Sequence, residues 1–123
     1  MTTRRKKLGA HGEALAAAHL TQAGYEIVAK NWRCSVGELD LVVQLGELLV
    51  FVEVRTRRGN RLGSPEESVT PAKQAKLIEL AHTYLAEYSN SDIPWRIDVI
   101  AIVLNTQYDL VRLDHIPYAV GEA

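Results

Sequence analysis

The chain has 123 residues, of which 47% are hydrophobic and 24% charged, and its formal net charge is −1. This length and balance are typical of one folded domain spanning residues 1–123, and they exclude global disorder. No apolar run approaches the roughly 18 residues that a transmembrane helix needs, and the basic N-terminal region lacks the apolar core of a signal peptide. The single cysteine, Cys34, excludes an internal disulfide and a cysteine zinc cluster, so we expect a cytoplasmic protein that does not enter a membrane.

The charged residues are unevenly distributed along the chain. Residues 1–76 hold 12 Lys and Arg against 8 Asp and Glu, whereas residues 77–123 hold 2 against 7. The basic residues form three groups, which are Arg4-Arg5-Lys6-Lys7, then Arg55, Arg57, Arg58 and Arg61, and then Lys73 and Lys76. Such an asymmetric field attracts a polyanion to one side of a protein, so we expect nucleic acid as a partner. The alternative is that these groups are ordinary solvated surface charge.

The first half of the chain reads as a helix followed by three strands. Residues 8–24 are predicted to be helical, because apolar residues recur near helical spacing, alanine is frequent, and Gly24 is a good C-terminal stop. Residues 25–32 are predicted to form a first strand. Two more strand-like runs, 37–43 and 49–55, flank the turn signal Gly46-Glu47 and predict a hairpin. Residues 58–69 are rich in turn-forming residues without periodicity and are predicted to be a loop.

The second half reads as a helix followed by two strands. Thr70 is a good N-cap and Pro71 suits a first helical position, so a helix is predicted from residue 71 to about residue 88. Residues 95–104 are a strongly apolar strand and residues 108–113 a shorter one, with residues 105–107 as the hairpin turn between them. The order αβββαββ predicts an α/β (α+β) fold, in which one mixed β-sheet is flanked by helices.

The turn at Gly46-Glu47 determines the register of the predicted hairpin. With a two-residue loop, residue i faces residue 93 − i. One face is then wholly apolar, and a slip by one residue would place carboxylates on it. The predicted pairs on this face are Leu39 with Val54, Leu41 with Val52, and Val43 with Val50.

The same register brings two carboxylates together on the other face. Asp40 lies opposite Glu53, and Glu38 lies opposite Arg55. Directly opposed residues hold their Cβ atoms roughly 4.5–5.5 Å apart, a separation that suits one shared divalent cation. Their repulsion must be offset by a bound cation, by a neighbouring guanidinium or by open solvent. In the last case Asp40 and Glu53 would simply face water on a half-exposed sheet.

The residue types around this pair predict a hard metal ion. Carboxylate oxygens suit Mg²⁺ or Mn²⁺, and the backbone carbonyl of Val54 could add a ligand next to Glu53. Glu13 lies on the first predicted helix and would reach the same centre if that helix packs on the sheet. Otherwise Glu13 is an ordinary surface residue.

Other side chains near these segments predict contacts with phosphate. Arg55 shares the face of Glu53 and could bind a phosphate through two hydrogen bonds. Lys73 and Gln74 open the second predicted helix, whose N-terminus favours an anion. We expect the nucleic-acid contacts to come from Arg55, Arg57, Arg58, Lys73 and Lys76, although the two lysines on their own could be solvated. Asp98 is expected to pair with Arg96 or Arg55, and the four histidines show no ligand spacing.

These segments together resemble a known family. Gly37-Glu38-Leu39-Asp40, followed by Phe51-Val52-Glu53-Val54-Arg55-Thr56-Arg57, is similar to the YraN-type family of small bacterial proteins, and so are residues 69–74 and 96–101. That family is grouped with the PD-(D/E)XK nuclease superfamily, close to archaeal Holliday-junction resolvases. The resemblance implies a restriction-endonuclease-like fold and an acidic triad of Glu13, Asp40 and Glu53, with Gln74 near the site.

One residue departs from the superfamily pattern. That pattern ends in lysine, where this chain has Arg55. Arginine keeps the positive charge, but its pKa above about 12 prevents proton transfer. The resemblance implies a metal-dependent endonuclease acting on nucleic acid, with branched DNA as an expected substrate. A homodimer would suit the cutting of two strands. The alternatives are a nucleic-acid-binding module of weak or absent catalysis, and a protein-interaction domain.

Overall fold

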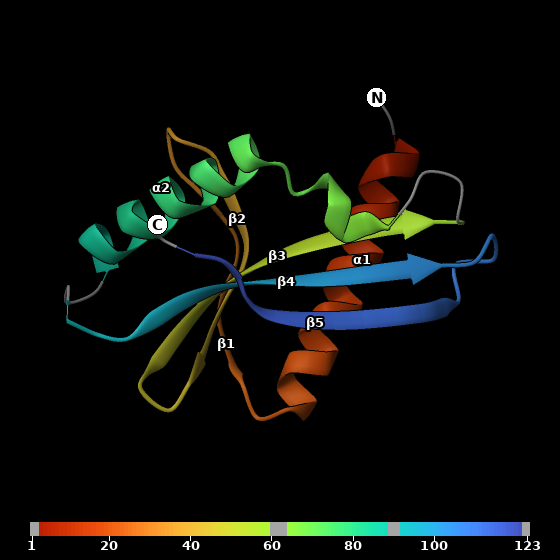
Figure 1. Ribbon diagram of the computed structural model, residues 1–123. Helices are drawn as coiled ribbons and strands as arrows, with labels where there is room; N and C mark the ends of the chain where they lie inside the picture. Colours follow the sequence, from red (N-terminus) through yellow and green to blue (C-terminus); the bar gives the residue numbers. More distant parts are fainter. Residues whose placement is uncertain (1–2, 60–63, 89–91, 122–123) are drawn as a thin grey trace.

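The computed structural model describes residues 3–59, 64–88 and 92–121, with side chains described from Lys7 onward. Its elements follow the predicted order αβββαββ, so the predicted fold class is confirmed (Figure 1). They are α1 (Thr3–Gln22), β1 (Glu26–Arg33), β2 (Glu38–Leu45), β3 (Leu48–Arg58), the short 3₁₀ helix η1 (Pro65–Ser68), α2 (Pro71–Tyr88), β4 (Trp95–Leu104) and β5 (Leu110–Val120). Within the described residues, neither long helix has the length and apolar character needed to cross a bilayer.

The strands form one mixed sheet in the order β1-β2-β3-β4-β5. Neighbouring strands are antiparallel except β3 and β4, which are parallel. Parallel neighbours need a long crossover connection, and η1 and α2 lie in the segment that makes it.

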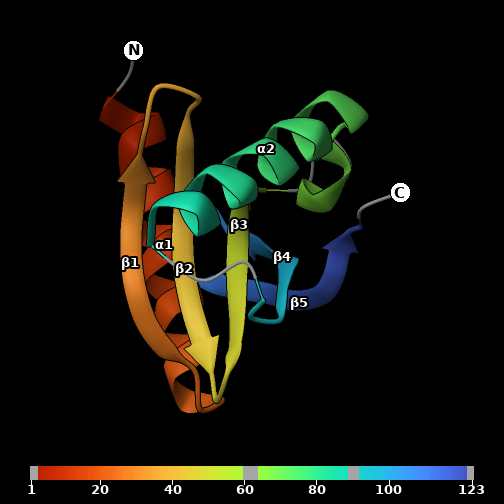
Figure 2. The same ribbon diagram turned by 90° about the vertical axis from the view of Figure 1, so that its left-hand side faces the viewer.

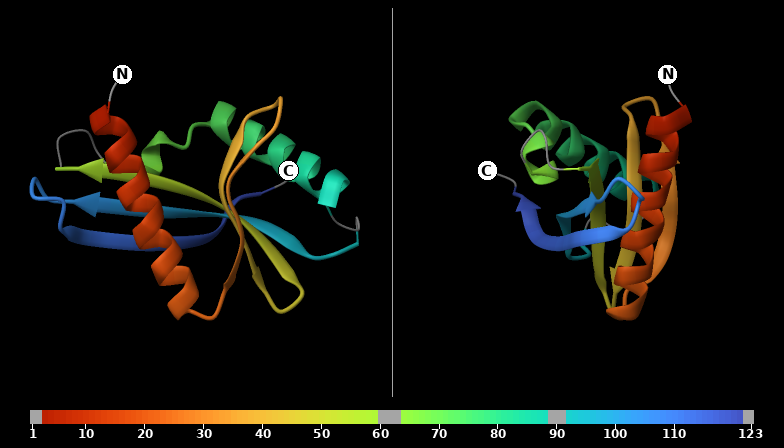
Figure 3. Two further views of the ribbon diagram at one scale, coloured as in Figure 1. Left: turned by 180° about the vertical axis from the view of Figure 1, so that it is seen from behind. Right: turned by 90° about the vertical axis from the view of Figure 1, so that its right-hand side faces the viewer.

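The two helices cover opposite faces of the sheet, with α2 in front of it and α1 behind it in Figure 2. Figure 3 shows α1 lying obliquely across the back of the strands. On that face Ala16 and Leu20 of α1 pack with Leu41, Val43 and other buried side chains of β2, β3 and β4. Because both faces are covered, the central strands are buried on both sides and read as apolar runs.

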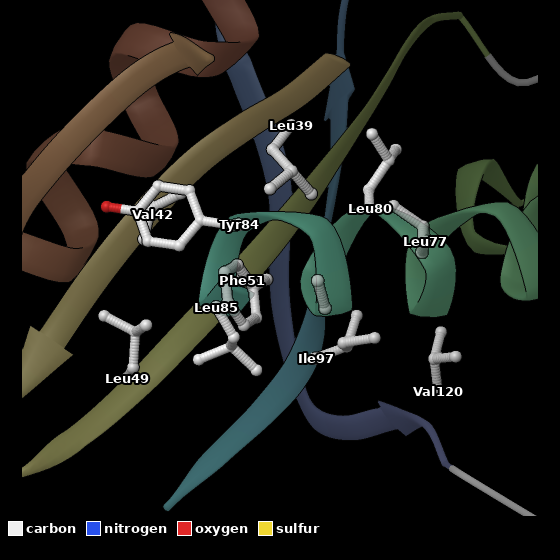
Figure 4. Close-up of a cluster of buried hydrophobic side chains, with 11 residues drawn as sticks. Leu39, Val42, Leu49, Phe51, Leu77, Leu80, Tyr84, Leu85, Ile97 and Val120 are labelled. Carbon is white, nitrogen blue, oxygen red and sulfur yellow. The ribbon is translucent and has the colours of Figure 1, made fainter. Parts of the chain in front are cut away.

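The other core lies under α2. Leu77, Leu80 and Tyr84 of the helix pack against Phe51 of β3 and Ile97 of β4 (Figure 4). The helix begins where it was predicted to begin, because Thr70 Oγ1 accepts a hydrogen bond from the Lys73 N–H at 3.2 Å.

Several element boundaries differ from the prediction. Helix α1 begins at Thr3, although its first turns are basic and carry no apolar periodicity. Strand β5 begins later, at Leu110, and continues past Pro117 because Val120 pairs with Ile97 and is buried. The predicted loop 58–69 contains the 3₁₀ helix η1. The first residue of that loop, Arg58, is the last residue of β3.

The predicted hairpin register is confirmed over five pairs, which run from Leu45 with Leu48 to Leu41 with Val52. At the turn Gly46 has a φ of +60°, a left-handed value that suits glycine. The prediction that Leu39 faces Val54 is wrong. Leu39 packs under α2 with Phe51 (Figure 4), whereas Val54 packs against the α1-side core.

The backbone of β1 explains this change of face. Lys30 pairs with Leu41 and Trp32 pairs with Leu39, so Asn31 lies across from Asp40. Asn31 has a φ of +53°, a left-handed conformation that asparagine tolerates better than most residues. This conformation interrupts the alternation of side chains along β1, and Trp32 and its partner Leu39 of β2 both lie on the α2 side.

Candidate carboxylate site

The Asp40 side chain lies between β2 and β3, just beyond their last paired residues. Its Oδ2 accepts a hydrogen bond from the Val54 backbone N–H at 2.9 Å. A side-chain oxygen thus satisfies a backbone donor at the point where the pairing of the two strands ends, after Leu41 and Val52. The carboxyl groups of Asp40 and Glu53 lie close enough for each to change the pKa of the other.

Glu53 lies in the interior with only 4% of its surface exposed. Its Oε2 is 3.1 Å from Arg55 Nε and 3.7 Å from Lys73 Nζ of α2. The interpretation that Glu53 faces open solvent is therefore wrong. Two side-chain cations offset part of the repulsion between the carboxylates, as the guanidinium alternative predicted.

The surroundings of this pair favour the protonated form of each acid. Burial, followed by the charge of Asp40, raises the pKa of Glu53 from 4.5 to about 7, although Lys73 and Arg55 act in the opposite direction. Burial also raises the pKa of Asp40, against the effect of the Val54 N–H and the hydrogen bond with Glu53. Near neutral pH the pair therefore retains a proton that two exposed carboxylates would lose.

Glu13 of α1 is close enough to Asp40 for the two charges to interact. Burial, followed by the charge of Asp40, raises the pKa of the half-buried Glu13. With its amide nitrogen turned toward the carboxylates, Asn31 donates to Glu13 Oε1 at 3.1 Å and to Glu38 Oε2 at 3.0 Å. The sequence reasoning missed Asn31, although an asparagine inside a strand is unusual and was the available signal.

Glu38 does not take its predicted place opposite Arg55. It forms an ion pair with Arg33 of β1, with Nε 3.7 Å from Oε2. The β2–β3 pairs end at Leu41 and Val52, before Glu38 is reached, while β1 pairs Arg33 directly with Glu38.

The donor set suits a cation that keeps part of its own hydration shell. Among the side chains that the structure describes, no three from His, Cys, Asp and Glu form a group that could hold a metal ion by themselves. Asp40 and Glu53 do converge, and Mg²⁺ commonly takes one or two carboxylates and completes its octahedron with water and phosphate oxygens. The residues therefore fit Mg²⁺ or Mn²⁺ as a two-carboxylate site. Val54 lies beside Ile100 of β4, and its N–H points to Asp40. The Val54 carbonyl as a further ligand stays a prediction.

The basic residues predicted to contact nucleic acid are divided among different surfaces. Arg55 and Lys73 lie at Glu53, and strand alternation places Arg57 on the same side of β3, where its Nε donates to the Gly59 carbonyl at 3.1 Å. Arg58 turns to the α1 side and lies 4.7 Å over the ring of Tyr108. Lys76 is exposed and 3.9 Å from Glu79 on the same helix.

Gln74 lies beside the carboxylates rather than among them. Its Nε2 donates to the Val69 carbonyl at 3.1 Å, and its side chain lines a small cavity with Val99. Val99 is the register partner of Glu53, so this cavity adjoins the site.

A second polar cluster occupies the opposite face of the sheet. Asp98 is fully buried and accepts two hydrogen bonds from Arg96, at 2.9 and 3.1 Å, so the predicted pairing with Arg96 is confirmed. His115 Nε2 lies 2.7 Å from Asp98 Oδ2, and the Tyr118 N–H donates to Oδ1 at 3.1 Å. No role was predicted for His115, because its partner is in another strand and the spacing of the histidines carries no signal.

The chain is similar to a family of proteins along most of its length. The family model described as "Uncharacterised protein family UPF0102" matches residues 12–102, a segment that contains Glu13, Asp40, Glu53 and Lys73. A UPF0102 protein of Roseiflexus castenholzii is 51% identical, and the match covers 100% of both chains. A UPF0102 protein of Chloroflexus aurantiacus is 46% identical over 99% of both chains, and one of Nocardia farcinica is 46% identical over 91% of this chain and 87% of its own.

Proposed function

The chain belongs to the uncharacterised protein family UPF0102, the YraN family that its motifs predicted, and we propose that it is a metal-dependent nuclease that hydrolyses phosphodiester bonds. The observation that carries the proposal is the buried pair of Asp40 and Glu53, with Arg55 and Lys73 at the same oxygen of Glu53. Two acids and two cations in one partly enclosed site are the groups that phosphodiester hydrolysis requires. The proposed substrate is DNA, and branched DNA in particular by the family resemblance.

Asp40 and Glu53 would hold Mg²⁺ or Mn²⁺ through their carboxylate oxygens. When bound, such a cation polarises a phosphoryl oxygen and lowers the pKa of a coordinated water. The hydrogen bond from Val54 to Asp40 fixes one carboxylate in place before any ligand arrives. Glu13 adds a third negative charge from α1, and Asn31 orients it.

Arg55 and Lys73 would hold the phosphate of the scissile bond. Arg55 Nε faces Glu53, which leaves the two terminal nitrogens of its guanidinium for phosphate oxygens. Lys73 stands on the first turn of α2, where the helix dipole adds to its attraction for an anion. Arg55 remains charged throughout, so its contribution is electrostatic and not a proton transfer.

Calorimetric titration with Mn²⁺ tests the metal site before any substrate is known. Wild type is expected to bind Mn²⁺, and Asp40→Asn is expected to lose at least tenfold in affinity, because it removes one of two charged ligands. Glu79→Gln changes an exposed carboxylate of α2 and serves as the control that keeps wild-type affinity. Equal binding by wild type and Asp40→Asn would contradict the site.

Cleavage of branched and linear DNA in Mn²⁺ tests the activity. Wild type is expected to cut, and the double variant Asp40→Ala/Glu53→Ala is expected to lose at least a hundredfold in rate, since both acids are removed. Equal cleavage by the two proteins would show a contaminating nuclease and refute the catalytic claim.

One observation favours a second candidate, which is a nucleic-acid-binding module with little turnover. Arg55 stands where the superfamily has lysine, and its Nε lies 3.1 Å from Glu53 Oε2 in an ion pair. If a titratable amine is needed at that position, Arg55→Lys would gain cleavage that the wild type lacks. Cleavage by wild type that is unchanged or reduced in Arg55→Lys would favour the nuclease.

A further inference from the structure

A small cavity opens on the α2 side of the sheet, next to the carboxylate pair. It has a volume of about 180 Å³. The described residues that line it are Glu66 of η1, Val69, Gln74 of α2, Val99 of β4, and Ile116 and Ala119 of β5. Pockets for drug-sized ligands measure roughly 300–1,000 Å³, so this cavity suits one ring rather than a whole nucleotide.

The cavity shares two neighbours with the proposed active site. Val99 lines it and is the register partner of Glu53, so the two side chains project from adjacent strands on the same face. Gln74 follows Lys73, whose Nζ is 3.7 Å from Glu53 Oε2. A group attached to a phosphate held by Lys73 and Arg55 would therefore lie within reach of the cavity.

The lining combines apolar walls with polar edges. Val69, Val99, Ile116 and Ala119 supply aliphatic surface. The Gln74 amide gives one N–H to the Val69 carbonyl at 3.1 Å, which orients it and leaves a second N–H and the carbonyl oxygen. Arg112 Nη2 holds Glu66 Oε1 at 2.9 Å, so the carboxylate is fixed at the rim as a second acceptor.

We propose that this cavity receives one unpaired nucleobase of the substrate strand, next to the phosphate that the carboxylate site binds. A base has flat apolar faces and an edge of donors and acceptors, which matches aliphatic walls and an amide that can donate and accept together. This inference rests on the proposed function. It narrows the preferred substrate to strands with an unpaired base at the site, such as single strands and branch points, because a paired base must first be unpaired and unstacked at an energetic cost.

The test compares two single-stranded DNA oligonucleotides of equal length in a buffer without divalent metal, one with bases and one with abasic positions. Wild type is expected to bind the base-bearing strand roughly tenfold more tightly, since only that strand can form hydrogen bonds with the Gln74 amide. The methyl NMR signals of Val99 and Ile116 are expected to shift with the base-bearing strand only.

Two variants test whether the preference for the base-bearing strand comes from this cavity. Gln74→Leu removes the amide edge, and Ala119→Leu fills the cavity while leaving Gln74 in place. Both are expected to lose the tenfold preference and retain binding of the abasic strand, because phosphate contacts are unchanged. Gln107→Leu changes an exposed glutamine on the β4–β5 turn and is the control that retains the preference.

The possible outcomes separate this inference from the proposed function. Binding of both strands with equal affinity, or without methyl shifts, would overturn the base site and leave the nuclease proposal standing. Binding of neither strand would overturn the base site, whereas the nuclease proposal is overturned separately by absence of cleavage in Mn²⁺. A base preference that survives in Gln74→Leu and Ala119→Leu would place the base elsewhere and overturn the inference.

Discussion

Glu53 has neighbours that act on its charge in opposite directions. Arg55 and Lys73 favour the ionised carboxylate, while burial and Asp40 oppose it, and the second pair is stronger. An acid whose charged form is disfavoured in the folded protein lowers the stability of that protein when it ionises. Ionisation of Glu53 therefore lowers the stability of the folded protein, and such perturbed acids are common at functional sites.

Glu53→Gln is predicted to stabilise the protein above pH 7. The pKa of Glu53 is about 7 in the folded chain and near 4.5 when unfolded, so the folded state binds the extra proton between these values. The free energy of unfolding of wild type therefore falls as the pH rises from about 4.5 to about 7, by on the order of 3 kcal/mol. Glutamine resembles the protonated acid and removes this loss.

Urea unfolding of wild type and Glu53→Gln at pH 5 and pH 8, with chelator present, measures the effect. Glu79→Gln is the matched control, since its carboxylate is exposed on α2. A difference between Glu53→Gln and wild type that is the same at both pH values would contradict the prediction.

At the scale of elements, the placement of Glu13 depends on how closely α1 approaches β3. Gly12 faces Thr56 of β3, and a Cβ built on Gly12 would lie 1.8 Å from Thr56 Oγ1 and 2.8 Å from Thr56 Cβ. Only a glycine allows this contact. The adjacent residue in the chain is Glu13, so the same close approach brings its carboxylate toward Asp40.

Gly12→Ala is predicted to destabilise the protein, although alanine is the better helix former. The clash with the Thr56 side chain is expected to cost about 1–3 kcal/mol, more than the roughly 1 kcal/mol gained in helix propensity. Gly9→Ala, on the same helix with no atom within 4 Å of its new Cβ, is expected to stabilise by up to about 1 kcal/mol. Thermal unfolding of the two variants checks the signs, and equal shifts would show that α1 can move away from β3 at no cost.

At the scale of the whole molecule, the buried Asp98 joins parts of the chain that are distant in sequence. It binds Arg96 of β4 and both His115 and the Tyr118 backbone of β5. Arg96 Nη2 also donates to the Tyr25 hydroxyl at 2.7 Å, which ties the segment after α1 to the sheet. This cluster lies on the α1 side, whereas the carboxylate pair and the cavity lie toward α2.

Asp98→Ala is predicted to destabilise the protein by about 3–5 kcal/mol, because it leaves the Arg96 guanidinium without a counter-charge in the interior. Glu79→Ala, which removes an exposed ion pair with Lys76, is expected to cost less than about 1 kcal/mol. Free energies of unfolding in urea at pH 7 compare the two. A loss for Asp98→Ala as small as that for Glu79→Ala would show that the cluster adds little to stability.

Local sequence patterns were enough to determine the element order, the hairpin register and the start of α2. Each depends on residues close together in the chain: a glycine turn between two alternating strands, and a threonine cap before a proline. They also predicted that Asp40 lies near Glu53, since a two-residue turn leaves one register that keeps one face wholly apolar.

The tertiary structure alone decided which distant groups join that pair and which do not. Asn31 adopts a left-handed conformation that the hydrophobic periodicity did not predict. Leu39, beside it in the sheet, lies on the α2 side and not on the predicted α1 side. Lys73 reaches Glu53, and Gln74 faces a cavity completed by β5, only because α2 crosses the sheet at one particular place. Such contacts join residues far apart in sequence, and they depend on how helices pack on the sheet, which is set by side-chain shape over the whole core.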